Sequence, residues 1–235
     1  MTKKTNFMTP RQIRESCKIL NPESPTETQV CAISEEFHQG INIFEGKKEL
    51  EKSVTFYGSA RFPQDHKYCK EAYNLARRIG EELGYAIVTG GAGGIMEAAN
   101  HGAFDAHVPS IGMTIVLPAE QNTNKYVTQE IPFDFFFTRK TLLKFSGEAY
   151  IFFPGGYGTL DEMFDLITLI QTRKISPAPV IMFGKEFWSP LVDFIKEKQV
   201  KEFGTISPDE ILFTMTDDHD EIIEIIKTAP IRDGE

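Results

Sequence analysis

The chain of 235 residues carries 34 acidic and 25 basic side chains, which give a formal net charge of −9. This length suffices for one large α/β domain without a stabilising metal, and the acidic balance argues against non-specific nucleic-acid binding, which needs a basic surface to displace counterions. The first residues lack the apolar core of a signal peptide, and no stretch approaches the roughly 20 apolar residues that cross a bilayer. We therefore expect a soluble, cytoplasmic protein with neither nucleic acid nor a membrane as partner.

Residues 1–50 are predicted to form an N-terminal helical extension. Pro10 opens a short helical stretch, a break follows at 21–25, and Thr26 with Gln29 forms a capping-box pattern before a longer helix with apolar residues at helical spacing. Two interpretations are open for this extension. It is either a packed helical appendage, or a regulatory or oligomerisation arm.

The three cysteines, Cys17, Cys31 and Cys69, have neither CxxC spacing nor a neighbouring cluster of histidines. Such usage indicates neither a disulfide framework nor a zinc site. We expect reduced thiols and no metal.

Residues 51–235 alternate strand-like apolar runs with helical stretches. We expect strands at 54–57, 86–89, 110–114, 133–137, 150–153, 180–183 and 212–215, and helices at 66–83, 94–104, 139–145, from 158 onward, 191–198 and 220–227. Alternation of this kind predicts an α/β fold, a Rossmann-like doubly wound parallel sheet with helices on both faces. Open parallel sheets bind ligands beyond the carboxyl ends of their strands, and three informative turns fall there.

The most informative turn is PGGYGTLDE, residues 154–162, between a strand and a helix. The first N–H groups of a helix lack internal partners and the helix dipole is positive there, so a phosphate can settle on Gly158 and Thr159. Glu162 follows so soon that we expect it in the first helical turn, with its carboxylate directed at the bound molecule.

A second glycine-rich turn, TGGAGGIMEAAN at 89–100, includes Gly90, Gly91, Gly94 and Glu97. The dinucleotide pattern GxGxxG is not met, because Met96 stands where the last glycine belongs. Glycines needed for close helix-on-sheet packing explain part of this pattern, and we favour a nucleotide-contacting turn. GxxxxGK followed by Ser or Thr is absent from the sequence, which argues against a P-loop triphosphatase.

Basic and hydroxyl side chains occur at two further places of the predicted sheet edge. Ser59 and Arg61 follow the first strand, and Arg139 with Lys140 follow the run FDFFF and are expected to begin a helix. Cations at a helix N-terminus oppose its dipole, so their placement calls for an anion nearby, which a phosphate ester would supply.

Together the PGGYGTLDE turn, the Arg-Lys pair upstream of it, GGAGGIMEAAN and GSAR resemble the LONELY GUY (LOG) family, once mislabelled as lysine decarboxylases. The resemblance covers residues from about 54 to 198, and the chain is similar to the larger bacterial members of this family. It implies a phosphoribohydrolase that releases the base and ribose 5-phosphate from AMP or an N6-modified, cytokinin-type AMP, without metal or cofactor, in a homodimer or larger homo-oligomer. The implied catalytic residues are Arg139 and Glu162, and the implied substrate-binding residues are Lys140, Gly155, Gly156, Gly158, Thr159 and, in the LPAEQ loop, Glu120.

The chemistry fits these residue types. Cleavage of an N-glycosidic bond builds positive charge on the ribose, so a carboxylate such as Glu162 stabilises the transition state and orients the attacking water. A decarboxylase would need a lysine placed for a pyridoxal Schiff base together with an acid partner, and we find no convincing pair. Two alternatives are kept: a non-catalytic nucleotide-binding or carrier protein, and another phosphosugar or nucleotide enzyme of this sheet class, including a dehydrogenase.

Overall fold

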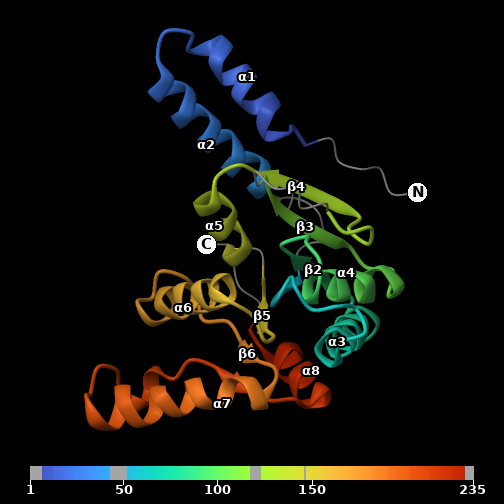
Figure 1. The fold of residues 1–235 in the computed structure, drawn as a ribbon, viewed down its shortest axis with the longest axis vertical. Coiled ribbons are helices and arrows are strands. Elements are labelled where there is room, and N and C mark those ends of the chain that lie inside the picture. The colour runs from blue at the N-terminus through green and yellow to red at the C-terminus, as the bar shows by residue number, and fades with distance from the viewer. Residues whose placement is uncertain (1–6, 43–51, 117–122, 146, 231–235) are drawn as a thin grey trace.

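The computed structural model describes residues 7–42, 52–116, 123–145 and 147–230. Two helices precede an alternation of strands and helices (Figure 1). The helices are α1 (Pro10–Leu20), α2 (Pro25–Asn42), α3 (Lys67–Leu83), α4 (Ile95–Asp105), α5 (Phe136–Phe145), α6 (Tyr157–Gln171), α7 (Lys185–Phe194), continued by a π-helical segment (Ile195–Glu202), and α8 (His219–Thr228). The strands are β1 (Ser53–Tyr57), β2 (Ala86–Thr89), β3 (Ser110–Ile115), β4 (Gln129–Phe133), β5 (Ala149–Phe152), β6 (Val180–Met182) and β7 (Thr214–Met215).

The strands form one parallel sheet in the order β4-β3-β2-β1-β5-β6-β7. Every residue of β1, β2, β5 and β6 is buried, as expected for a parallel sheet covered on both faces. The predicted doubly wound α/β class is therefore confirmed. The strand order reverses beside β1, so the carboxyl ends of β1 and β5 flank the crevice in which such sheets bind ligands.

Two apolar layers enclose the sheet. On one face α3, α4 and α8 contribute Leu75, Ile95 and Ile222 to one cluster. On the other face α5, α6 and α7 pack their apolar side chains, among them Met163 and the fully buried Trp188, into a second cluster. Because α5 and α6 share one layer, side chains from both can reach the same end of the sheet.

The N-terminal helices α1 and α2 pack against each other as a hairpin beyond the β4 edge of the sheet, drawn in blue in Figure 1. A disulfide joins Cys17 to Cys31 across this hairpin, with 5.7 Å between their Cα atoms. The expectation of three reduced thiols is therefore wrong for this pair, and Cys69 is a buried free thiol. The 14-residue separation looks unremarkable in sequence, and the turn between the helices is what brings the two side chains together.

Several predicted boundaries shift. The run at 133–137 is not a strand: β4 ends at Phe133, and Phe136 opens α5 with its side chain 58% exposed. The capping box predicted at Thr26 is also wrong, because α2 begins at Pro25 and the Ser24 hydroxyl accepts the Glu27 N–H. Within the described residues, no helix has the length and apolar character needed to span a bilayer.

Candidate functional site

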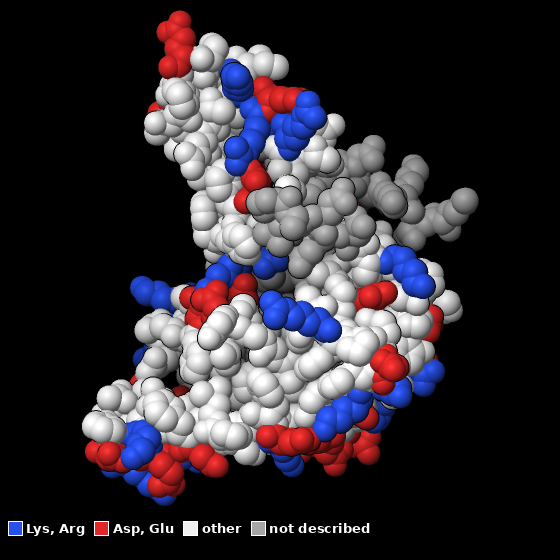
Figure 2. Space-filling model, viewed as in Figure 1, with Lys and Arg blue, Asp and Glu red and all other residues white. Residues whose placement is uncertain are grey.

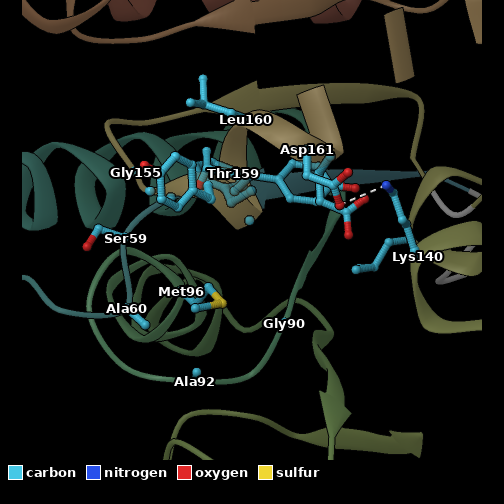
Figure 3. A pocket seen from close by; sticks show the side chains of 18 of the residues that line it. Ser59, Ala60, Gly90, Ala92, Met96, Lys140, Gly155, Thr159, Leu160 and Asp161 are labelled. Atoms are coloured by element: carbon cyan, nitrogen blue, oxygen red, sulfur yellow. Dashed lines mark ion pairs between the residues drawn. The ribbon is translucent and has the colours of Figure 1, made fainter. Parts of the chain in front are cut away.

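A cavity of about 1070 Å³ opens at the carboxyl ends of the central strands. Figure 3 shows the turns that carry Ser59, Gly90 and Gly155, after β1, β2 and β5, arranged around this space. The structure brings most of the candidate residues into its lining, namely Ser59, Arg61, Gly90, Arg139, Lys140, Gly155, Gly156, Gly158, Thr159 and Glu162.

The turn after β5 leads into the N-terminus of α6 through closely packed backbone. The Thr159 and Leu160 N–H groups both donate to the Gly156 carbonyl at 3.1 Å, while the N–H groups at the first two helical positions have no partner within a helix. A Cβ at Gly155 would lie 2.1 Å from the Thr159 Oγ1, so only glycine fits there. The Ser59 N–H donates to the Pro154 carbonyl at 3.0 Å, which ties this turn to the turn after β1.

Glu162 is the sixth residue of α6, so it lies in the second helical turn rather than in the first. It follows Thr159 by three residues and shares its helix face, and both side chains are buried yet line the cavity. Burial raises the pKa of Glu162 from 4.5 to about 7, although the charges of Lys144, Arg139 and Lys140 lower it. Its Oε2 is buried and has no hydrogen-bond partner.

Arg139 is the fourth residue of α5, not the first. Its guanidinium lies over the Phe136 ring, 5.5 Å from the centroid, and its Nε is buried without a hydrogen-bond partner. Desolvation lowers the pKa of Arg139, while the charges of Glu162 and Tyr57 raise it. A Cβ at Gly90 would lie 3.6 Å from an Arg139 Nη1, so the glycine turn after β2 leaves room beside this guanidinium.

Lys140 links α5 to α6 through ion pairs. Its Nζ lies 2.8 Å from the Asp161 Oδ2, the contact dashed in Figure 3, and 3.4 Å from the Asp165 Oδ2. Asp165 also pairs with Lys144. Desolvation lowers the pKa of Lys140, but Asp161, Asp165 and Glu162 together raise it above its ordinary value. Basic and acidic side chains accordingly gather side by side where α5 meets α6 (Figure 2).

Three candidate residues of the second glycine-rich turn do not line the cavity. Gly94, at φ +62°, lets this turn approach the Ser59 carbonyl, which would lie 2.2 Å from a Cβ. Gly91, at φ +72°, packs against β3, and Glu97 accepts a hydrogen bond from Gln64. The contacts of the two glycines are those of packing, and that of Glu97 is a hydrogen bond to a neighbouring turn. Glu120 lies outside the described residues.

Other lining residues escaped sequence reasoning. Tyr57 is one of them, and its place at the carboxyl end of a central strand was the sequence signal that could have identified it. Its ring stacks on Phe152, and its hydroxyl is buried without a hydrogen-bond partner. An apolar wall comes from scattered elements that share no motif, and its residues are Met96, Ile115, Phe136, Phe137, Leu143 and Phe187. No group of three or more His, Cys, Asp or Glu residues suited to a metal occurs in the part of the chain that the structure describes.

Known proteins resemble this chain in sequence and in fold. A family model described as possible lysine decarboxylase matches residues 96–226. A cytokinin riboside 5′-monophosphate phosphoribohydrolase of Rhodococcoides fascians is 26% identical over 161 residues, which cover 66% of this chain and 79% of that protein. A probable cytokinin riboside 5′-monophosphate phosphoribohydrolase of Oryza sativa subsp. japonica is 29% identical over 172 residues, covering 69% and 76%.

Among solved structures, the molybdenum cofactor binding protein of Rippkaea orientalis superposes with a TM-score of 0.53 at 24% identity, over 75% of this chain and 94% of that one. Likeness at this level concerns the fold alone. The matched family region includes the turn after β5, α5 and α6, and it begins well after the α1–α2 hairpin.

Proposed function

Because the chain belongs to the LONELY GUY family, whose sequence model is described as possible lysine decarboxylase, we propose that it is a nucleoside 5′-monophosphate phosphoribohydrolase. It cleaves the N-glycosidic bond of AMP or an N6-modified AMP and releases the free base and ribose 5-phosphate. One observation carries the proposal: the buried carboxyl group of Glu162, whose Oε2 has no hydrogen-bond partner, belongs to a residue that lines the same cavity as the start of α6.

Each residue type has a task in this reaction. The 5′-phosphate binds at the start of α6, where Gly158 offers its N–H group, Thr159 offers its side-chain hydroxyl and the helix dipole has its positive end. Arg139 neutralises phosphate charge or aligns the sugar. The Glu162 carboxylate, beside the anomeric carbon, stabilises the positive charge that develops on the ribose and orients the attacking water. Binding the remote phosphate supplies energy for that orientation.

The buried acid favours a hydrolase over a carrier. Burial holds the pKa of Glu162 at about 7, which means that the folded protein bears a free-energy cost for this carboxylate. A protein that only held a phosphate would gain nothing from that cost, whereas a group titrating near neutral pH suits proton transfer or charge stabilisation. A Schiff-base role does not suit Lys140, because its ion pair with Asp161 favours the protonated amine.

The substrate class follows from the other wall of the cavity. Met96, Phe136 and Phe187 are apolar residues of its lining, against which a purine ring can pack. The cavity volume of about 1070 Å³ lies slightly above the ordinary range of ligand pockets. AMP and its N6-substituted analogues therefore both belong to the proposed class.

We also propose a homodimer or larger homo-oligomer in the cytoplasm. Exposed aromatic side chains on adjacent helices, Phe145 on α5 and Phe164 on α6 at 50% and 39% exposure, support self-association. Sedimentation of the purified protein over a range of concentrations measures it. The cytoplasmic location stays a prediction.

The deciding experiment is a panel of purine nucleoside monophosphates with chromatographic detection of released base, run on the wild type, Glu162→Gln and the exposed-site control Glu35→Gln. We expect base release from AMP or an N6-substituted AMP, a loss of at least about a hundredfold in Glu162→Gln, and no change in Glu35→Gln. Thermal stabilisation by AMP without base release would indicate a carrier. No base from any monophosphate and no stabilisation would end both ideas.

A further inference from the structure

A carboxylate from the N-terminal hairpin lies at the start of the helix that carries Arg139. Glu36 of α2 is 1% exposed. It accepts hydrogen bonds from the Asp134 N–H at 2.7 Å, the Phe135 N–H at 3.3 Å and the Thr138 hydroxyl at 2.6 Å. These donors belong to the turn before α5 and to its first helical turn, so Glu36 acts as a cap supplied by a distant segment of the chain.

The sequence of α5 explains why such a cap matters. Its first turn contains no acidic residue, and Arg139 and Lys140 follow directly, although cations near a helix N-terminus oppose the dipole. Glu36 supplies an acidic side chain at the start of α5 from another segment of the chain. Burial raises the pKa of Glu36, while its bonds to Thr138, Asp134 and Phe135 lower it.

The hairpin holds the same helix at a second level. Gly40, one turn after Glu36 on α2, packs so closely on Leu142 that a Cβ would lie 2.2 Å from the Leu142 Cδ1. From α1, Arg14 pairs with Asp134 and lies over the Phe135 ring at 5.5 Å. The disulfide between α1 and α2 joins the two sets of contacts. The hairpin, a segment outside the matched family region, therefore contacts α5 both at its first turn and at Leu142.

We propose that Glu36 is a positioning residue for Arg139: by capping α5 from the N-terminal hairpin, it fixes the guanidinium at the cavity. The inference rests on the proposed role of Arg139 in binding the phosphorylated ligand. It assigns the hairpin a function in the site, although no hairpin residue lines the cavity.

The test is a double-mutant cycle on full-length protein, with the AMP dissociation constant measured by calorimetry. Glu36→Gln keeps the side-chain shape and removes the charge, and the exposed neighbour Glu35→Gln is the matched control. We expect Glu36→Gln to weaken AMP binding about tenfold in the wild-type background and less than twofold in the Arg139→Ala background. A merely structural loss of stability would weaken AMP binding equally in both backgrounds.

Hydrogen exchange gives a second readout that does not depend on the ligand. The amides of residues 139–143 should exchange at least tenfold faster in Glu36→Gln and unchanged in Glu35→Gln. Should Glu36→Gln fail to fold, Thr138→Val removes one of its three donors and should shift both readouts in the same direction.

Equal effects in the two backgrounds, or unchanged exchange in α5, would overturn the proposal. Failure of the wild type to release base leaves both readouts valid and sinks only the proposed hydrolysis. Failure of the wild type to bind AMP at all would overturn the positioning role as well.

Discussion

Replacement of Glu162 by glutamine should stabilise the protein, and by an amount that depends on pH. The carboxyl has a pKa of 4.5 when solvated and about 7 in the fold, chiefly because burial desolvates it. Below about pH 4.5 the group is protonated in both states and has no effect on the free energy of unfolding. Between the two pKa values the unfolded chain loses the proton while the folded chain keeps it, so stability falls as pH rises.

The full difference corresponds to about 3 kcal/mol above pH 7, since each pKa unit is worth about 1.4 kcal/mol. Glutamine resembles the protonated acid and avoids this cost. The free energy of unfolding of Glu162→Gln should therefore exceed that of the wild type by an amount that grows by about 2 to 3 kcal/mol between pH 5 and pH 8.

Urea denaturation of both proteins at half-unit pH steps measures this difference, and contributions of other titrating groups cancel in it. Glu35→Gln, on an exposed part of α2, is the matched control. If the difference in unfolding free energy between Glu162→Gln and the wild type does not change with pH, burial does not raise the pKa of Glu162. The argument that this acid titrates near neutral pH would then be refuted. In the wild type, kcat for base release should rise with pH through about 7, as the carboxylate forms.

Three more predictions concern other parts of the chain. Gly155→Ala should lower the free energy of unfolding by about 1–3 kcal/mol, because its Cβ would lie 2.1 Å from a side chain of α6. Gly156→Ala, which has open space around its Cβ, should melt at the wild-type temperature. Equal melting temperatures for the two variants would contradict the close approach at Gly155. Tyr57→Phe removes a buried hydroxyl without a hydrogen-bond partner, so the ligand-free variant should be as stable as the wild type or up to about 1 kcal/mol more stable. The rise in melting temperature caused by AMP should be smaller than in the wild type. A destabilised variant would mean that the hydroxyl already has a partner. Reduction of the Cys17–Cys31 bond, which closes a loop of separation 14, should cost about 3 kcal/mol in a denaturant titration, and the double alanine variant should not respond to reductant.

Local sequence was enough for every strand of the described sheet except β4. The runs at 54–57 and 86–89 are short, apolar and bounded by glycine turns, and they form β1 and β2 with at most one residue of difference. Their continuous apolar character reflects burial on both faces, which a parallel sheet requires. The strand predicted at 133–137 is wrong because apolar composition alone does not distinguish a buried strand from a helix with exposed aromatic rings. The side chain that caps the start of α5 is Glu36, about a hundred residues earlier in the chain, so the local sequence did not contain that signal.

The glycine-rich turn at residues 154–162 could also be predicted from the local sequence. Its glycines, its helix start and its acid occupy nine consecutive residues, and a helix N-terminus carries its unpaired N–H groups wherever it occurs. Such properties are local, so the sequence by itself determined that residues 154–162 lead from a strand into a helix, and the phosphate site proposed there rests on the same local pattern.

Only the tertiary structure decided how the acid in that turn is charged and what surrounds it. The pKa of Glu162 depends on burial and on Lys144, Arg139 and Lys140 of another helix, and Tyr57 reaches the same cavity from the end of β1. Desolvation and charge act through space between segments far apart in the chain. The same holds for the cysteine pair and for Glu36, whose partners are set by how the hairpin packs and not by their spacing in sequence.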